Sequence, residues 1–358
     1  MTKLLRLGIA AIAGIVALGG LGCSQKGGDT AGTPSSAGKP AGGKLRIVYI
    51  PKSSGNAYFD DVISGFKEEA AKVGADFTTT APATSDATSQ ISFIKDQVQL
   101  GVNVIAITPN SPDALNATLD DAKAKGVIVI TVDADLDKNE THRVVAVLPT
   151  DFTQVGPGQL DTLASQLPNG GDFAILSATH DAPNQNAWIE GMKKALTDAK
   201  YAKFKLVDVV YGDDDAPKST TEAEALFAKY PNLRGIISPT SVGLAAAAQS
   251  LDTAGGYPGG PHANPAGGIV LTGLSTPNQM KKFVEKGVVA KFQLWSPHDM
   301  GVLACYLADG LKSGKIKPDE GVEVDVPGLG KHKFGPKGVI TAGPMVTFDK
   351  SNIGQYNF

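Results

Sequence analysis

From residue 44 onward the chain alternates short apolar runs with longer segments in which apolar residues recur every three or four positions. The run 45–50 predicts a buried strand, and the spacing of apolar residues from Phe59 to Val73 predicts a helix with one buried face. Gly74 and Gly101 follow two of the predicted helices, at a position where glycine commonly ends a helix. Repeated strand–helix units predict parallel strands, a doubly wound sheet and right-handed crossovers.

The predicted elements fall into two sets. The first set has strands at 45–50, 77–80, 104–108 and 127–132, with helices from 59, at 85–100 and at 112–125. The second set has strands at 144–148, 172–176, 205–211, 235–238, 269–274 and 289–294, with helices at 151–167, 186–199, 216–230, from 242, at 277–286 and at 299–312. Two sets of similar size predict an α/β protein with two similar lobes. The glycine- and proline-rich stretch 255–268 is expected to be a surface loop away from the functional site.

The first 43 residues follow a different pattern. Lys3 and Arg6 precede an uncharged apolar stretch at 7–21, whose length of about 15 residues is short for a bilayer span of about 20. These features predict a signal peptide at 1–22. Cys23 follows Gly22 and resembles the lipidated cysteine of a bacterial lipobox, although Gly20 stands where the lipobox usually has leucine. We therefore expect lipidation at Cys23, with plain secretion as the alternative, and a flexible linker over 24–43.

Composition narrows the function classes. The 358 residues are 42% hydrophobic and 19% charged, which is ordinary for globular proteins, and the length favours two domains. The net charge of −3 becomes −5 when Lys3 and Arg6 leave with the signal peptide, so no basic field indicates nucleic-acid binding. Cys305 is then the only cysteine besides Cys23, and its apolar helix predicts a buried thiol without a disulfide.

The sequence contains no catalytic pattern that holds. We find no phosphate-binding loop, no G-x-S-x-G elbow and no H-E-x-x-H helix, and the five histidines lack the spacing of metal ligands. Asp213, Asp214 and Asp215 form an acidic run after a strand, which we interpret as a solvated loop in preference to a calcium site. Because the run lies at the carboxyl end of its strand, a role at the rim of a ligand site is also open. We therefore predict a protein that is not an enzyme and uses no cofactor or metal.

Informative polar residues cluster where predicted strands end, and open α/β sheets bind their ligands at this edge. After the first strand come Lys52, Asn56, Tyr58 and Phe59, which combine hydrogen-bonding groups with aromatic rings. Phe59 also belongs to the apolar face that its predicted helix buries, so Phe59 could either pack in the core or contact a ligand. Asp133 follows the fourth strand, where a carboxylate can accept two hydroxyl groups of one sugar.

The second set supplies a matching group of residues. Asn184 and Gln185 open a helix, and further candidates follow three later strands: Pro239, Ser241, Ser275 and Trp295. Amides and hydroxyls both donate and accept hydrogen bonds, which suits neutral polyols better than anions. The sequence therefore predicts a ligand-binding cleft formed by both lobes.

These motifs resemble the ribose-type periplasmic sugar-binding proteins of ABC importers, and within them the rhamnose-binding and autoinducer-2-binding branch. The likeness extends over nearly all of 44–358, through IPKSSGNAYFD, TVDAD, NQNAW, YGDDDAPKS, GLSTPN and LWSP to the closing VTFDKSNIGQYNF. It implies the periplasmic binding protein type I fold, with a three-segment hinge between an N-terminal lobe of 44–148 plus 297–343 and a C-terminal lobe of 149–296 plus 344–358.

The resemblance also implies a function. Lys52 and Asp133 match polar ligand contacts of the autoinducer-2 branch, whereas Asn184-Gln185 and Pro239-Thr240-Ser241 depart from it. The rhamnose branch, whose motif is more similar to NQNAW, fits better. We therefore expect a monomer that captures a deoxyhexose such as rhamnose and delivers it to a permease and its ATPase. Autoinducer-2, another sugar, or a role as the ligand-loaded partner of a chemoreceptor or sensor kinase are the alternatives. A transcription regulator of this architecture would need a helix-turn-helix where this chain has an export signal.

Overall fold

The computed structural model describes residues 43–358. The predicted signal peptide, the lipidation site at Cys23 and nearly all of the predicted linker lie outside the described residues. Within 43–358, no helix combines the length and the apolar character needed to cross a membrane.

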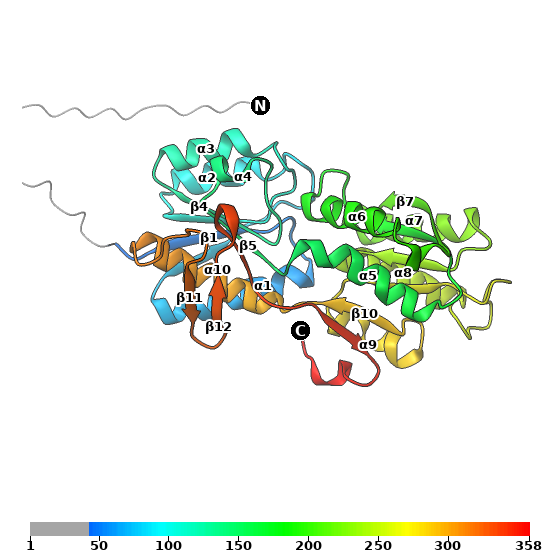
Figure 1. Ribbon diagram of the computed structural model, residues 1–358. Helices are drawn as coiled ribbons and strands as arrows, with labels where there is room; N and C mark the ends of the chain where they lie inside the picture. Colours follow the sequence, from blue (N-terminus) through cyan, green and yellow to red (C-terminus); the bar gives the residue numbers. More distant parts are fainter. Residues whose placement is uncertain (1–42) are drawn as a thin grey trace, which may run out of the picture. The chain divides into compact units, whose positions relative to one another are not determined.

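Six parallel strands form the first sheet, in the order β13-β5-β4-β3-β1-β2, and Figure 1 shows this part of the molecule with β1, β4 and β5 labelled. They are β1 (Arg46–Ile50), β2 (Asp76–Thr79), β3 (Val104–Ile107), β4 (Ile128–Val132), β5 (Val145–Leu148) and β13 (Val339–Thr341). Helices α1 (Ala57–Val73) and α10 (Pro297–Lys312) cover one face, and α2 (Ile91–Gln99) and α3 (Asn116–Ala124) cover the other, with the short α4 (Asn139–His142) before β5. Because both faces are covered, the central strands are almost entirely buried. We call this part the first lobe.

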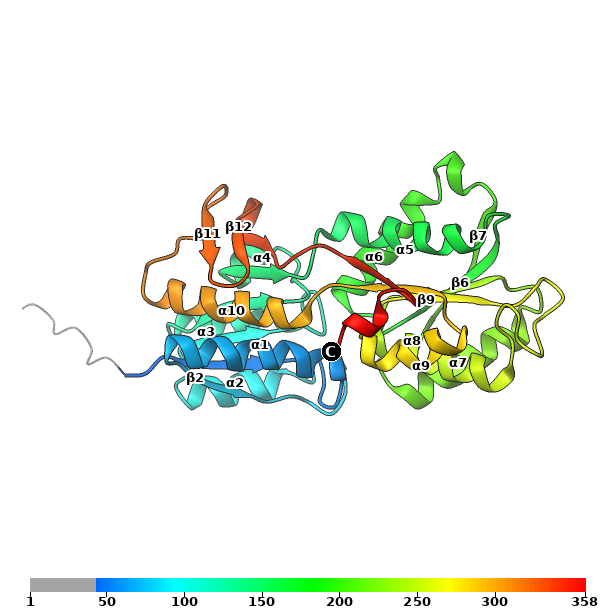
Figure 2. The same cartoon turned by 90° about the horizontal axis from the view of Figure 1, so that it is seen from below.

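Four parallel strands form the second sheet, in the order β7-β6-β8-β9. They are β6 (Gly171–Ser177), β7 (Phe204–Tyr211), β8 (Gly235–Ser238) and β9 (Val270–Gly273). One face carries α5 (Phe152–Gln166) and α6 (Pro183–Ala195), and the other carries α7 (Ala216–Lys229), α8 (Ser241–Ala254) and α9 (Pro277–Lys286) (Figure 2). The antiparallel pair β10 (Lys291–Leu294) and β14 (Val346–Asp349) continues this sheet beside β9, through a bridge between Leu274 and Gln293. We call this part the second lobe.

Three short segments connect the two lobes. The chain passes from the first lobe to the second between β5 and α5, returns between β10 and α10, and crosses again between β13 and β14. Two of these segments are hydrogen-bonded to each other: the Ala342 amide donates to the Leu148 carbonyl over 2.8 Å, and the Gly343 amide donates to the Pro149 carbonyl over 3.1 Å.

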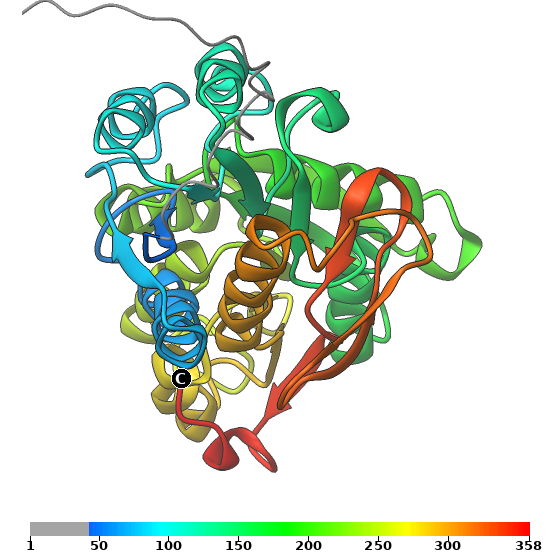
Figure 3. The same ribbon diagram turned by 90° about the vertical axis from the view of Figure 1, so that its left-hand side faces the viewer.

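Two glycines bring α1 and α10 close together (Figure 3, in blue and orange). A Cβ atom on Gly65 would lie 2.0 Å from the carbonyl oxygen of His298, and one on Gly301 would lie 2.0 Å from that of Val62. Any larger residue would separate the helices, so this contact fixes the middle of α1 against the first half of α10. Cys305 is buried on α10, as its sequence predicts, and burial raises the pKa of its thiol to about 12.

The structure confirms two lobes built on parallel sheets and differs from the prediction in detail. Helix α2 begins at Ile91 and not at 85, because the preceding residues form turns around the buried Gln90. The Gln90 side chain donates to the carbonyls of Pro51 and Thr108 over 3.0 and 2.8 Å, a role that helical periodicity does not reveal.

No element was predicted after residue 312, where the structure has the antiparallel hairpin β11 (Glu323–Val326) and β12 (Gly330–Lys333) as well as β13 and β14. β11 and β12 are largely polar and partly exposed, and β13 and β14 have only three and four residues, so none of them shows the long apolar run that marks the central strands. Three 3₁₀ turns, η1 (Ala199–Tyr201), η2 (Pro336–Gly338) and η3 (Ile353–Gln355), complete the described fold.

Candidate ligand-binding site

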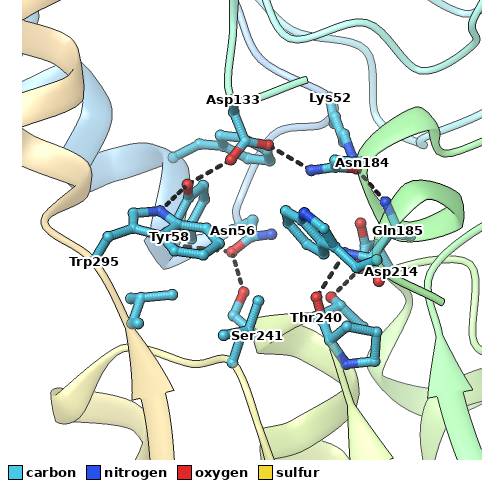
Figure 4. Close-up of a pocket in the computed structure, with 15 residues that line it drawn as sticks. Lys52, Asn56, Tyr58, Asp133, Asn184, Gln185, Asp214, Thr240, Ser241 and Trp295 are labelled. Atoms are coloured by element: carbon cyan, nitrogen blue, oxygen red, sulfur yellow. Dashed lines mark hydrogen bonds between the residues drawn. The ribbon is translucent and has the colours of Figure 1, made fainter. Parts of the chain in front are cut away.

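A cavity of about 360 Å³ lies between the two lobes, where strands of both sheets end (Figure 4). Both lobes and the β10–α10 segment contribute to its lining, which consists of Lys52, Asn56, Tyr58, Phe59, Asp133, Asn184, Gln185, Trp188, Asp214, Pro239, Thr240, Ser241, Leu274, Leu294 and Trp295.

Helix starts position several of these side chains. Asn56 is the N-cap of α1, and its side-chain oxygen accepts a hydrogen bond from the Tyr58 amide over 3.1 Å. Asn184 and Gln185 lie in the first turn of α6, and Ser241 is the first residue of α8. The free amides and the positive end of the dipole at a helix start favour oxygen acceptors.

Asp133 follows β4 with a φ of 69°, in the left-handed region that aspartate tolerates better than most residues. Its amide donates to the Val147 carbonyl over 2.9 Å, so the backbone is anchored to β5. Only 3% of the Asp133 side chain is exposed, and the same holds for Lys52.

A chain of hydrogen bonds crosses the cavity from one lobe to the other. Lys52 Nζ donates to Asn184 Oδ1 over 2.7 Å, and Asn184 Nδ2 donates to Asp133 Oδ2 over 2.9 Å. The Tyr58 hydroxyl donates to Asp133 Oδ1 over 2.6 Å and accepts from Trp295 Nε1 over 2.8 Å. Asn184 of the second lobe thus contacts both charged residues that the first lobe contributes to the cavity, Lys52 and Asp133.

Burial dominates the electrostatics of these groups. It raises the pKa of the Asp133 carboxyl, against the opposing effects of the Lys52 charge and the Tyr58 hydrogen bond. Burial also lowers the pKa of Lys52, against the attraction of Asp133 and Asp214. The pKa of Tyr58 is held well above its usual value by burial and by the neighbouring Asp133 charge, so Tyr58 remains a hydrogen-bond donor at neutral pH.

The second lobe adds a wall of neutral polar groups. Gln185 Nε2 donates to the Pro239 carbonyl over 2.6 Å, which holds the side chain at the end of β8. Ser241 Oγ donates to Asn56 Oδ1 over 3.2 Å, a third hydrogen bond between the lobes. Thr240 donates to Asp214, and burial raises the pKa of the Asp214 carboxyl despite the nearby Lys52 charge.

Aromatic and aliphatic side chains complete the lining. Trp188 and Trp295 lie with ring centroids 5.6 Å apart, and Phe59, Leu274 and Leu294 add apolar surface. Trp188 is 1% exposed, and its indole nitrogen has no hydrogen-bond partner among the described residues. A buried donor without a partner is costly, so a group that accepts its hydrogen bond would stabilise the site.

The structure brings together every predicted ligand-binding residue except Ser275. The Ser275 hydroxyl lies behind Ser241 and donates to Gln279 Oε1 over 3.1 Å, so it is turned away from the lining. Phe59 belongs both to the core and to the lining, so its two interpretations do not exclude each other, and Trp295 likewise belongs to both.

Sequence reasoning missed Asp214, Trp188, Thr240, Leu274 and Leu294 as candidates. Asp214 lines the cavity, so the rim role left open for 213–215 describes it better than the solvated-loop interpretation does. The solvated loop fits Asp213, which pairs with Lys218 at the surface, whereas Asp215 caps α7 by accepting from the Lys218 amide over 2.8 Å. Within 43–358, no group of three His, Cys, Asp or Glu residues is arranged to hold a metal ion.

Two α/β lobes around a cleft lined by paired polar groups are the hallmarks of a solute-binding protein. Residues 47–316 match the periplasmic binding protein domain, and the chain belongs to this family, specifically to the sugar-binding solute receptors of ABC importers. Proteins of this class are transport components and not enzymes.

Solved structures and a curated relative agree with this assignment. A sugar ABC transporter protein from Actinomyces odontolyticus is 37% identical, with a TM-score of 0.69, and the match covers 88% of this chain and 98% of that one. A solute-binding protein from Clostridium phytofermentas with bound L-rhamnose is 32% identical, with a TM-score of 0.82, and the match covers 88% and 99%. The D-allose-binding periplasmic protein of Escherichia coli is 25% identical over 278 residues, which are 75% of this chain and 85% of that protein.

Proposed function

We propose that this protein captures a neutral deoxyhexose, with rhamnose as the leading candidate, in the cleft between its lobes and delivers it to an ABC permease. The observation that carries this proposal is the hydrogen-bond chain from Lys52 through Asn184 to Asp133, because it joins buried polar groups of both lobes at one cavity. A ligand that replaces these contacts with its own hydroxyls bridges the same two lobes.

The cavity has the chemistry for a polyol ring. Asp133 and Asp214 supply carboxylate acceptors, Lys52 supplies a charged donor, and the amides of Asn184 and Gln185 supply both donors and acceptors. Trp188 and Trp295 offer flat apolar surfaces for a ring face, and the unpartnered Trp188 nitrogen offers a further donor.

A 6-deoxy sugar fits the apolar part of the lining. A 6-deoxy sugar has a methyl group where other hexoses have a hydroxymethyl group. The methyl group loses no hydrogen bonds to water when it packs against Phe59, Leu274 and Leu294, whereas a hydroxyl group there would need a hydrogen-bond partner. The rhamnose-bound protein that is 32% identical supports the same choice.

The charge of the cavity disfavours anionic sugars. Asp133 and Asp214 outnumber Lys52, the only basic residue of the lining, and Lys52 already faces both carboxylates. A sugar phosphate or uronic acid would bring a further negative charge into a buried site that has no spare cation to neutralise it.

Proteins of this family are exported to the periplasm and work with a permease and an ATPase. We propose that this chain acts as a monomer tethered through a lipid on Cys23. In a lipidating host, Cys23→Ser should move the protein from the membrane fraction to the soluble fraction without changing its ligand affinity. A variant that stays in the membrane fraction like the wild type would refute the anchor.

A thermal-shift screen followed by calorimetry tests the ligand. We expect L-rhamnose or another deoxyhexose to raise the melting temperature more than ribose, arabinose, allose or autoinducer-2 does, because ligand binding to the folded state stabilises it by mass action. A response to autoinducer-2 alone would replace the deoxyhexose proposal, and no response to any sugar would refute sugar capture.

A further inference from the structure

A groove of about 1190 Å³ lies directly outside the sugar cavity, between the starts of α1, α7 and α8. It is lined by both lobes, and its residues are Ser53, Ser54, Gly55, Asn56, Ala57, Ala83, Asp214, Asp215, Ala216, Pro217, Thr220, Val242, Ala245, Ala246, Gln249 and Gln279.

The groove and the cavity share two residues, Asn56 and Asp214. Asn56 Oδ1 accepts hydrogen bonds from the Tyr58 amide and from Ser241 Oγ, while its side-chain nitrogen donates to no group within 43–358. Asp214 Oδ1 accepts from Thr240, while its second oxygen has no hydrogen-bond partner in the described part of the chain. The two residues shared by the cavity and the groove therefore keep one donor, the Asn56 side-chain nitrogen, and one acceptor, the second Asp214 oxygen, available for a ligand.

The chemistry of the groove selects an uncharged occupant. Its wall combines small side chains, such as Ala57, Ala216 and Ala245, with the amides of Gln249 and Gln279, and it contains no Lys, Arg or His. Asp214 and Asp215 are its only ionisable residues, so a phosphate or carboxylate substituent would meet two negative charges and no cation.

We propose that the ligand is an uncharged glycoside, whose sugar ring occupies the cavity and whose O-linked substituent passes between Asn56 and Asp214 into the groove. This inference rests on the proposed sugar-binding function and adds a substrate class to it. The 3.2 Å hydrogen bond from Ser241 to Asn56 is the contact that the substituent displaces, and the free groups of Asn56 and Asp214 bind the linking oxygen and its neighbouring hydroxyl.

Calorimetry on the full chain tests the proposal with three probes: L-rhamnose, methyl α-L-rhamnoside and 4-nitrophenyl α-L-rhamnoside, or the same series for whichever sugar the screen identifies. We expect the wild type to bind both glycosides with dissociation constants no more than about threefold higher than that of the free sugar. Ala216→Trp fills the groove from the exposed first turn of α7, and it should weaken the nitrophenyl glycoside about tenfold or more while leaving the free sugar within about twofold.

Ala225→Trp is the matched control, because Ala225 is exposed on the same helix and does not line the groove. It should change neither affinity. Gln249→Trp blocks the groove from α8, and it replaces Ala216→Trp as the blocking variant if Ala216→Trp folds poorly.

Free sugar that binds while both glycosides fail would overturn the inference and leave the proposed function standing. Equal loss of free sugar and glycoside in both blocking variants would also overturn it. If neither sugar nor glycoside binds the wild type, the proposed function itself fails.

Discussion

The two halves of the binding cavity differ in the kind of polar group that they present. The first lobe contributes a buried ammonium and a buried carboxylate, Lys52 and Asp133, together with the hydroxyl of Tyr58. The second lobe contributes mostly neutral groups, the amides of Asn184 and Gln185 and the hydroxyls of Thr240 and Ser241, with Asp214 at the margin.

This difference suggests a division of labour. Hydrogen bonds to charged groups are about twice as strong as neutral ones, so the first lobe should supply most of the affinity. The neutral groups of the second lobe contact the first lobe directly, Asn184 to Lys52 and Asp133 and Ser241 to Asn56, so they should control how the lobes come together. A ligand shifts an open–closed equilibrium only by its difference in affinity for the two states.

The largest effect is expected at the charged half. Asp133→Ala should weaken sugar binding about 10- to 150-fold, which corresponds to about 1.5–3 kcal/mol for hydrogen bonds to a charged group. Calorimetry at neutral pH measures it. Asp137→Ala is the control on the same loop, because Asp137 is exposed and its side chain makes no hydrogen bond. A loss below about threefold with the fold intact would remove Asp133 from the site.

A smaller effect is expected at the neutral half. Asn184→Ala should weaken binding about tenfold, since it removes one amide from the ligand and leaves Lys52 and Asp133 without their shared partner. Asn186→Ala changes an amide in the same helix turn that donates to the His180 carbonyl and does not line the cavity, so it should bind like the wild type. If Asn186→Ala weakens binding as much as Asn184→Ala, the effect belongs to the helix and not to the site.

Trp188→Phe tests the indole nitrogen and should cost about two- to tenfold in affinity, the value of one neutral hydrogen bond. The free energy of unfolding of the ligand-free protein should fall, because phenylalanine leaves part of the volume of the buried indole empty, although the nitrogen has no partner within 43–358 to lose. Calorimetry and urea unfolding provide the two readouts. An unchanged affinity would mean that the Trp188 nitrogen does not contact the ligand.

The buried carboxylate also predicts a pH effect on stability in the ligand-free protein. Burial raises the pKa of Asp133, so the folded protein keeps its proton to a higher pH than the unfolded chain does. The free energy of unfolding of the wild type should therefore fall relative to that of Asp133→Asn, which cannot ionise at this position. The fall should occur as the pH rises from below the usual aspartate pKa to above the pKa of Asp133 in the folded protein. Urea unfolding across this range measures the difference, and a wild type that gains relative stability as pH rises would contradict the assigned direction.

The periodicity of the sequence predicts the core of the fold because burial dictates it. Strands β1, β3, β4 and β5 are covered on both faces and appear as apolar runs. In the hairpin β11–β12, β11 alternates charged and apolar residues over only four positions and β12 has no apolar side chain, so neither strand can be distinguished from a loop. Side chains that stabilise turns, such as Gln90, are also invisible to periodicity because their partners are distant in the sequence.

The sequence predicts those residues of the ligand-binding site whose position depends on where a strand ends. Lys52, Asp133 and Asn184 follow strands, and the ends of parallel strands meet at one edge. The same rule was insufficient for Ser275, whose side chain turns toward α9, and for Asp214, whose acidic neighbours suggested solvent. Side-chain direction after a strand depends on local backbone angles, and Asp214 has a φ of 52° that sequence alone does not reveal.

The central claim is that one ligand bridges the charged half and the neutral half of the cavity, and solution scattering tests it most directly. The radius of gyration of the wild type should fall when the sugar identified by the screen is added at saturation, because hinge closure around a ligand brings the lobes together. In a variant with Asn184→Ala and Gln185→Ala, the decrease should be smaller at saturating ligand. Equal radii with and without a ligand of proven binding would contradict bridging and leave a rigid cleft as the explanation.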